Sequence, residues 1–459
     1  MIRLFNTYFP TRTLLLTLSE AVLVTSGFLL AVLLSTGTAV DARIYLLYEN
    51  GAGRIALVVL VFLMLMYYFD LYTTSILTNR REVLTRLVGV LGCTFVALAA
   101  LYYTFPAASL GGTVLWSGVI IIAVVVPVWR SCFFALNSSD RFAERIVIYG
   151  DGPLATPLMD SIARRPELGL RVAGFVGSES QIAGIPAVDQ NAMAEFIKHE
   201  GVHRIIVTMG DRRGKLPVGE LLKLKAGGIQ IQDGPEYYET VTGKIPLESL
   251  RLSWLLFSPG FHVRTSLRIY KRMFSFILGS IALILASPIM ALAAVAIKLD
   301  SSGPALFRQS RVGENGKLFT VYKFRSMYDG ADKGILHPAQ HKDPRVTRVG
   351  KWLRRFRLDE LPQLFNVING DMAFVGPRPM TPKDEEECAA HIPFYRERWL
   401  IKPGATGWAQ INRGYNATIE DHMEKLAYDL FYIKNVSAGL DAYIMFATLK
   451  ILLLGRGGR

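Results

Sequence analysis

Four long apolar stretches dominate the first third of the chain. They cover residues 13–35, 55–72, 83–105 and 112–135. Each is close to the roughly 20 residues that an α-helix needs to cross a bilayer. We therefore predict a bundle of four transmembrane helices within residues 1–138.

Two acidic residues interrupt these stretches. Glu20 lies within the first stretch, and Asp70 lies near the end of the second. A charge exposed to lipid is costly. We therefore expect both side chains to face the interior of the bundle or the membrane interface rather than to form a proton path.

Basic residues between the apolar stretches predict their orientation. Arg80, Arg81 and Arg86 cluster between the second and third stretches, whereas residues 106–111 carry no charge. Loops rich in lysine and arginine stay on the cytoplasmic side of the membrane. We expect the N-terminus, and everything after the fourth helix, to be cytoplasmic.

From residue 141 onward, short β-branched runs alternate with polar helical stretches. The runs read RIVIYG, RVAGFVG, RIIVTMG and GIQIQDG. Such alternation predicts a parallel α/β sheet. The segment GDGPLA, from Gly150 to Ala155, follows a strand and resembles a phosphate-binding turn. No acid stands at a clear end of the second strand, about 20 residues further on, where it would bind a ribose. We therefore predict a structural or regulatory Rossmann-like (CoA-binding-like) module over residues 139–260 rather than a working dinucleotide site.

A further apolar segment, residues 273–297, is long enough to cross the membrane but has basic residues on both flanks. Both flanks therefore favour the cytoplasm. Pro288, which follows Ser287, removes a backbone donor and bends a helix. We predict a re-entrant helical hairpin over about residues 269–299, hinged at Ser287 and Pro288, with a kinked fifth span as the alternative.

Composition supports a membrane protein with an anionic partner. The chain has 459 residues, 51% of them hydrophobic, and a formal net charge of +13. That charge suits lipid headgroups or nucleotides. Nucleic-acid binding would explain the charge but not four apolar helices. Three cysteines without regular spacing predict neither disulfides nor a zinc site.

The chemistry concentrates in the segment RRFRLDELPQ, residues 354–363. The apolar residues after it have helical spacing, so we expect a helix to begin near Asp359 with Pro362 in its first turn. Asp359 and Glu360 would then lie at a helix N-terminus, where the unpaired amides lower carboxylate pKa values and attract phosphate.

The two acids are suited to different roles because neighbouring helical residues point roughly 100° apart. One carboxylate can attack phosphorus as a nucleophile. The other can bind Mg²⁺ together with substrate phosphate oxygens. Arginines nearby could neutralise a diphosphate. The competing interpretation is a surface patch in which Arg355 pairs with Asp359, and Arg357 with Glu360, worth a few tenths of a kcal/mol, roughly, for each pair.

Four segments of the last third, in this order behind a Ser-Pro hairpin, closely resemble the bacterial sugar transferase family. They read LFRQSRVGENGKLFTVYKFRSM, DPRVTRVGKWLRRFRLDELPQ, NGDMAFVGPRP and KPGATGWAQIN. The resemblance covers about residues 264–456 and implies a mainly helical catalytic domain, within a domain of residues 261–459. Members are monotopic phosphoglycosyl transferases, and the four helices and Rossmann-like module look like the long form that starts exopolysaccharide or O-antigen repeat units.

The resemblance implies a role for each matching residue. Asp359 matches the nucleophile, Glu360 the magnesium-associated acid and Pro288 the hairpin-breaking proline. The residues expected to contact phosphate or support the site are Arg354, Arg357, Arg378, Lys323 and Arg325. After Gln410 the sequence INRGYN departs from the commoner N-G-R-N pattern, which leaves the role of Arg413 open.

The implied reaction is ping-pong transfer of hexose-1-phosphate from a UDP-sugar to undecaprenyl phosphate, with Mg²⁺, through a phospho-aspartate. The implied location is the bacterial inner membrane, in a multi-pass protein whose catalytic domain is cytoplasmic and contacts membrane lipids. The hexose and the oligomeric state, a homodimer included, stay open.

Three alternatives use the same features. A membrane nucleotide-sugar dehydratase would need a Tyr-x-x-x-Lys pair, and no tyrosine here has a lysine four residues on. A non-catalytic regulator of polysaccharide assembly would not need Asp359, Glu360 and Arg354. A zinc site at His337 and His341 lacks a helix to align them, because Pro338 lies between.

Overall fold

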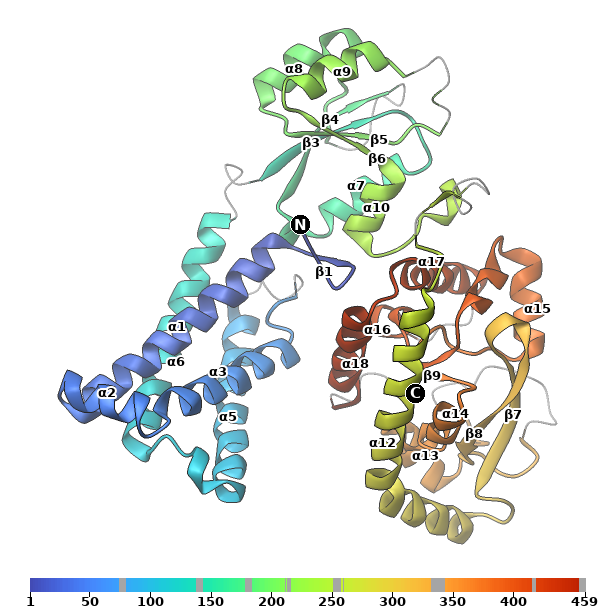
Figure 1. Ribbon diagram of the computed structural model, residues 1–459. Coiled ribbons are helices and arrows are strands. Elements are labelled where there is room, and N and C mark those ends of the chain that lie inside the picture. The colour runs from blue at the N-terminus through green and yellow to red at the C-terminus, as the bar shows by residue number, and fades with distance from the viewer. Residues whose placement is uncertain are drawn as a thin grey trace. The chain divides into compact units, whose positions relative to one another are not determined.

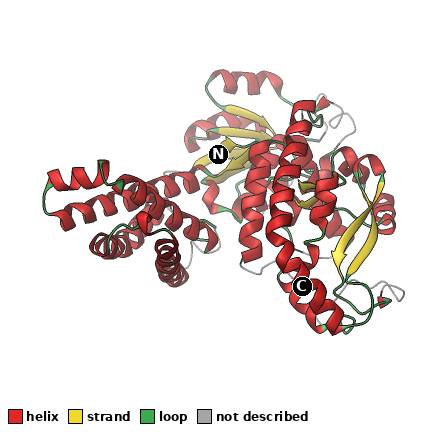
Figure 2. Ribbon diagram, turned by 60° about the horizontal axis from the view of Figure 1, so that its bottom comes forward, coloured by secondary structure: helices red, strands yellow, loops and turns green. Residues whose placement is uncertain are grey.

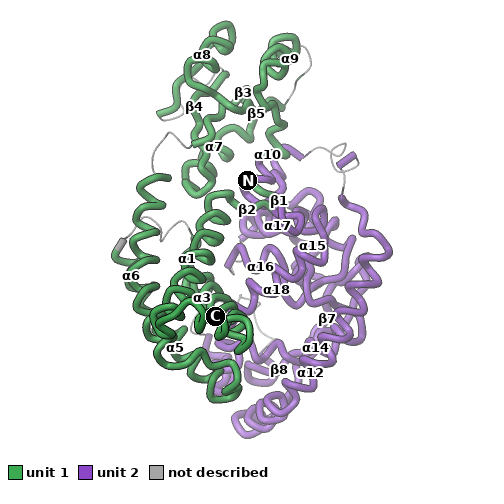
Figure 3. Tube along the Cα trace, turned by 60° about the vertical axis from the view of Figure 1, so that its left-hand side comes forward, with its two compact units in different colours: residues 1–2, 8–237 green, residues 3–7, 238–459 purple. Residues whose placement is uncertain are grey.

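The computed structural model describes residues 1–73, 80–137, 143–177, 184–210, 212, 216–250, 257–258, 260–331, 343–414 and 418–453. The protein is a mixed α/β chain in which helices predominate (Figure 1). Strands are found in a parallel sheet, in one long hairpin and in short pairs (Figure 2). The chain forms two compact units: residues 1–2 with 8–237, and residues 3–7 with 238–459 (Figure 3).

Each predicted apolar stretch of the first unit is a helix within a few residues of its expected bounds. The helices are α1 (Thr11–Thr36), α3 (Gly51–Tyr68), α5 (Arg80–Thr104) and α6 (Gly112–Asn137). All four are long and apolar enough to cross a membrane. A short helix that we did not predict, α2 (Ala39–Leu47), follows α1, and the Thr38 side chain caps it by accepting from the Asp41 amide.

These helices share one apolar core. Val24, Phe28, Phe62 and Val126 are among its fully enclosed residues. A Cβ atom at Gly118 would lie 2.3 Å from the Phe28 ring. The missing side chain therefore lets α1 and α6 approach closely, as small residues do between apolar helices.

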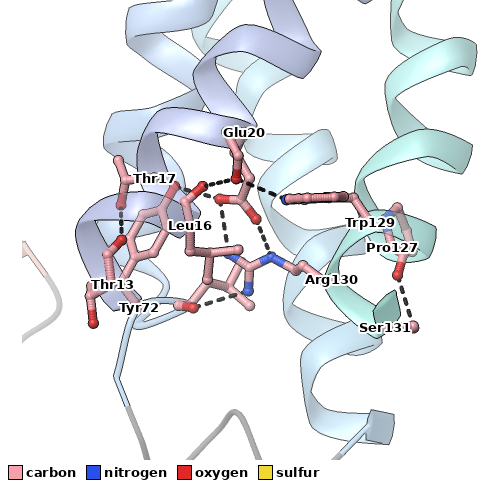
Figure 4. Close-up of polar contacts among 11 residues, drawn as sticks. Thr13, Leu16, Thr17, Glu20, Tyr72, Pro127, Trp129, Arg130 and Ser131 are labelled. Carbon is pink, nitrogen blue, oxygen red and sulfur yellow. Dashed lines mark hydrogen bonds and ion pairs between the residues drawn. The ribbon is translucent and has the colours of Figure 1, made fainter. Parts of the chain in front are cut away.

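An ion pair is enclosed within this core (Figure 4). The Arg130 Nε atom lies 2.5 Å from Glu20 Oε1, and both side chains are at most 1% exposed. The Tyr72 hydroxyl donates to Glu20 Oε2 at 2.7 Å, and Arg130 Nη1 donates to the Leu71 carbonyl at 3.0 Å. We expected Glu20 to face the bundle interior or the membrane interface, and the structure buries it among the apolar helices. Asp70 is also buried and lies 3.4 Å from Arg86.

The predicted parallel sheet is present, with strand order β4-β3-β5-β6. The strands are β3 (Glu144–Tyr149), β4 (Leu170–Val176), β5 (Arg204–Val207) and β6 (Gln230–Asp233). The helices after them are α7 (Ala155–Ala163), α8 (Met193–Glu200), α9 (Val218–Ala226) and α10 (Gly234–Thr242). In the GDGPLA turn, a Cβ at Gly152 would lie 1.7 Å from the Thr208 carbonyl oxygen. This close approach of two backbones explains the glycine without requiring a bound ligand.

The segment predicted as a hairpin is one helix, α12 (Thr265–Asp300), whose course bends (Figure 1). Pro288 leaves the Ile284 carbonyl, four residues earlier, without its usual backbone donor. The Ser287 hydroxyl donates to that same carbonyl at 2.8 Å. The structure therefore differs from a hairpin of two separate helices, because Ser287 replaces the hydrogen bond that proline removes and helical geometry continues through the bend.

The rest of the second unit surrounds a short turn that carries the two acids. The antiparallel hairpin pairs β7 (Leu306–Val312) with β8 (Leu318–Phe324), and the parallel pair joins β9 (Ala373–Val375) to β10 (Gly404–Thr406). The helices are α13 (Arg348–Arg355), α14 (Gln363–Asn369), α15 (Pro382–His391), α16 (Trp408–Asn412), α17 (Ile419–Asn435) and α18 (Ala438–Leu453). At the N-terminus, β1 (Ile2–Leu4) pairs with β2 (Thr7–Phe9), and the Ser437 hydroxyl donates to the Phe5 carbonyl at 3.1 Å.

Candidate active site

Asp359 and Glu360 lie on a single 3₁₀ turn, η8 (Leu358–Glu360), between α13 and α14. The α-helix begins only after Pro362, which is its N-cap. The prediction that one helix starts near Asp359 is therefore wrong by several residues. Arg357, with a left-handed φ of 54°, turns the chain immediately before the acids. This turn, rather than a helix N-terminus, presents both carboxylates.

Asn366 on α14 connects this turn to strand β8. Its Oδ1 accepts from the Tyr322 amide at 3.1 Å, and its Nδ2 donates to the Thr320 carbonyl at 2.7 Å. The side chain is fully buried. These bonds fix β8 beside the turn, so that Lys323 near the end of the strand donates to Glu360 Oε1 at 3.2 Å.

Three cations surround Glu360. Arg378 Nη2 donates to the same Oε1 atom at 3.1 Å, and Arg357 Nη1 lies 3.7 Å from Oε2. The Glu360 side chain is 19% exposed. Burial alone would raise the pKa of Glu360, but Arg378, Lys323 and Arg357 outweigh it and hold the pKa at about 2. Glu360 is therefore ionised at every physiological pH.

Asp359 has the opposite shift. Burial, followed by the charge of Glu360, raises the pKa of Asp359 to about 6, against the lowering effect of Lys323 and Arg354. The expectation that both pKa values fall is wrong for Asp359, because the chain leaves it poorly solvated beside a second anion. The neighbouring acids thus differ in proton affinity, which favours separate roles.

The predicted basic residues differ in the groups that they contact. Lys323, Arg357 and Arg378 converge on Glu360, as described above. Arg354 Nε donates to the Ser326 hydroxyl at 2.8 Å, and burial, opposed by Asp359 and Asp343, lowers the pKa of Arg354.

Arg325 is directed elsewhere. Its two terminal nitrogens donate to the Ser302 carbonyl at 2.6 Å and the Ser301 carbonyl at 2.8 Å, at the end of α12. We conclude that Arg325 anchors the segment that links α12 to the hairpin. Arg355, which the surface-patch alternative paired with Asp359, is exposed and lies 5.7 Å from the Phe356 ring.

Sequence reasoning missed the residues that hold the GPRP turn, residues 376–379. Lys271 Nζ donates to the Val375 carbonyl at 3.2 Å, just before the turn. The Tyr432 hydroxyl, which donates to Asp441 Oδ1 at 2.5 Å, also lies 3.2 Å from that carbonyl. Arg398 donates to the Arg378 carbonyl at 2.7 Å. These residues come from α12, α17 and the segment after α15, so no local motif could have revealed them.

Two further observations concern metals and Arg413. Among the residues that the structure describes, no group of three or more His, Cys, Asp or Glu side chains is arranged to hold a metal ion. His337 and His341 lie outside the described residues. Arg413 forms an ion pair with Glu424, which also contacts Lys244 at 2.5 Å.

Two segments of the chain match known protein families. Residues 266–455 match the family described as bacterial sugar transferase, and residues 67–215 match the CoA-binding domain family. A UDP-glucose:undecaprenyl-phosphate glucose-1-phosphate transferase of Escherichia coli (strain K12) is 35% identical over 355 residues, covering 73% of each chain.

Two other relatives have names that specify different sugars, glucose in one and N-acetylgalactosamine in the other. A protein of Klebsiella pneumoniae with the same name as the E. coli relative is 46% identical over 67% of each chain. A UDP-N-acetylgalactosamine-undecaprenyl-phosphate N-acetylgalactosaminephosphotransferase of Aeromonas hydrophila is 43% identical over 48% of this chain and 52% of its own length. This chain therefore spans about half of the Aeromonas relative and nearly three quarters of the E. coli relative.

Proposed function

This chain belongs to the bacterial sugar transferase family, and on that premise we propose that it transfers a hexose-1-phosphate from a UDP-sugar to undecaprenyl phosphate. The observation that carries the proposal is the pair Asp359 and Glu360, in which one acid has a pKa of about 6 and the other is ringed by three cations. This arrangement combines a nucleophile that is ionised at neutral pH with a cationic surface for a diphosphate.

Asp359 acts as the nucleophile in our proposal. Its carboxylate oxygen attacks the sugar-bearing β-phosphorus, and the bond from that phosphorus to the bridging oxygen breaks, releasing UMP. The sugar phosphate remains on Asp359 as an acyl phosphate. A phosphate oxygen of the lipid then attacks the same phosphorus, so that the carboxylate leaves and the lipid carries a diphosphate-linked sugar.

The cations have two functions in this scheme. Arg378, Lys323 and Arg354 neutralise the diphosphate as charge develops on the leaving UMP. Lys323 and Arg378 also keep Glu360 ionised, as its pKa of about 2 indicates.

Glu360 would hold Mg²⁺. The donor set fits this ion, because Mg²⁺ is commonly held by one or two carboxylates and completes its coordination with substrate phosphates. When bound, Mg²⁺ would neutralise negative charge on the diphosphate oxygens.

The chain is a membrane protein in which we place α1, α3, α5 and α6 as four spans of the inner membrane. We infer that α12 enters and leaves by the cytoplasmic face. The bent course of α12 (Figure 1), the proline within it and the basic residues on both flanks support this topology. This topology would also suit the reaction, because a water-soluble donor and a bilayer-bound acceptor can meet only at the membrane interface.

The test uses purified full-length protein with undecaprenyl phosphate, Mg²⁺ and a panel of UDP-sugars, and records UMP. We expect release with at least one UDP-hexose, and loss of release in Asp359→Asn with an unchanged circular dichroism spectrum. The matched control is Glu386→Gln, which removes the charge of an exposed acid on α15 in the same unit. Near wild-type turnover by Asp359→Asn would remove the nucleophile assignment. No release with any sugar would favour a non-catalytic regulator.

A further inference from the structure

Arg398 is a buried charge that the proposed reaction does not use. It belongs to the 3₁₀ helix η9 (Tyr395–Leu400), and its side chain is 7% exposed. Its Nε donates to Asp429 Oδ2 at 2.9 Å, and its Nη1 lies 3.5 Å from Glu385 Oε2. The two carboxylates are themselves only 3% and 4% exposed. The guanidinium is therefore clamped between two enclosed anions.

Such a cluster is not an efficient way to stabilise a fold. Desolvation of buried ions costs about as much as their attraction returns, and apolar residues of similar volume often serve equally well. Here the cluster has one more contact: Arg398 Nη2 donates to the backbone carbonyl of Arg378 at 2.7 Å. The clamped guanidinium thus holds the backbone of a residue whose own side chain reaches Glu360 at 3.1 Å.

We propose that Arg398 is a positioning residue: it fixes the backbone of Arg378 so that the Arg378 guanidinium is held in place for the diphosphate. This inference rests on the proposed function of the site. The other end of the GPRP turn is fixed independently, because the Gly376 amide donates to the Thr406 carbonyl at 2.9 Å across the β9-β10 pair. The neighbouring carbonyls have their own donors: Pro377 accepts from the Gly404 amide at 2.9 Å, and Pro379 accepts from Arg311 Nη1 at 3.2 Å. Arg398 holds the carbonyl of Arg378 itself, the residue whose side chain serves the site.

The planar arginine fork suits this task better than lysine. Arg398 contacts Asp429, Glu385 and the Tyr395 hydroxyl through some nitrogens while another reaches the Arg378 carbonyl. Lysine keeps the charge but offers one nitrogen, which cannot take these positions together. Arg398→Lys should therefore keep a positive charge between Asp429 and Glu385 but lose the hydrogen bond to the Arg378 carbonyl.

The experiment is a double-mutant cycle on full-length protein in detergent, with kcat/KM for the UDP-sugar as the readout. We expect Arg398→Lys to lower this value about 10- to 100-fold, as for a displacement of about 1 Å at a reacting centre. The KM for undecaprenyl phosphate should stay within about twofold. If Arg398 acts through Arg378, then adding Arg398→Lys to Arg378→Ala should cost less than about twofold more.

A purely structural role predicts a different pattern. Losses that multiply in the double variant, or wild-type kcat/KM in Arg398→Lys, would overturn the inference. Lys434→Gln is the matched control: it breaks a buried pair with Glu239, formed at 2.9 Å between α17 and α10, and should lower Tm without changing kcat/KM per folded molecule.

A second variant covers the case in which Arg398→Lys does not fold. Glu385→Gln removes one clamping charge but keeps an oxygen that can accept from Trp399 Nε1, now at 2.8 Å. We expect it to raise the KM for the UDP-sugar several-fold in the wild-type background and not in Arg378→Ala. An equal effect in both backgrounds contradicts the inference, whereas absence of UMP release by the wild type refutes the proposed function instead.

Discussion

The raised pKa of Asp359 predicts the acid limb of the first half-reaction. With a pKa of about 6, Asp359 is about 90% ionised at pH 7 and about 9% ionised at pH 5. Only the carboxylate attacks phosphorus, so kcat/KM for UMP release should fall about tenfold between these pH values. An ordinary aspartate, with a pKa near 3.9, would lose less than about a tenth of its activity over the same range.

The assay should omit the lipid acceptor, because a phosphate monoester titrates near pH 6 and would add its own limb. Single-turnover UMP release at low UDP-sugar concentration then reports the free enzyme. The groups facing Asp359 are Glu360, Lys323 and Arg354. Of these, the positive charge of Lys323 lowers the pKa of Asp359. Lys323→Met should therefore move the midpoint upward, above pH 6.

Lys317→Met is the control, because it removes the same charge from an exposed position at the other end of the β7-β8 hairpin. It should leave the midpoint unchanged. A flat profile from pH 7 to pH 5, or a downward shift in Lys323→Met, would refute the assignment of the limb to Asp359.

Three further predictions concern the membrane helices and the metal. Glu20→Gln leaves Arg130 buried without its anion, so it should lower the free energy of unfolding by about 3 to 5 kcal/mol in denaturant titrations in micelles; an equal loss in the exposed control Glu49→Gln would contradict this. Pro288→Ala restores the missing backbone donor and should straighten α12, so that a C-terminal tag becomes accessible to a periplasm-only reagent. Labelling of the same tag in the wild-type protein would contradict the re-entrant topology. EDTA should stop UMP release, and added Mg²⁺ should restore it; full activity in EDTA would exclude Mg²⁺ from the reaction.

Regular patterns in the chain predicted the elements well. Apolar stretches of nearly constant length became α1, α3, α5 and α6, and β-branched runs became the four parallel strands. These signals are local, because a helix or strand buries residues at a regular spacing that can be seen within a short stretch of sequence. The burial of Glu20 was predictable for the same reason, since a charge in an apolar helix must turn away from lipid.

The site was only partly predictable. Asp359, Glu360 and their cations stand out in the sequence, but their pKa values do not, because desolvation and neighbouring charges depend on side chains from β8, α13 and the GPRP turn. A helix rule suggested a lowered pKa for both acids, and folding produced opposite shifts. Arg325 matched the motif as well as Lys323 did, and strand alternation would place both side chains on one face. The strand β8 ends at Phe324, however, so Arg325 leaves that alternation and reaches the carbonyls of Ser301 and Ser302 instead.

Residue order and chemistry were enough to predict which segments are apolar helices, which are strands, and which acids and cations belong to the diphosphate site that we propose. Folding was needed to show that Asn366 joins α14 to β8 and that Arg398 holds the backbone of Arg378. The physical reason is distance along the chain. Contacts between residues 20 to 50 positions apart form only when the core brings their elements together. The order of residues along the chain does not show which elements will pack against each other.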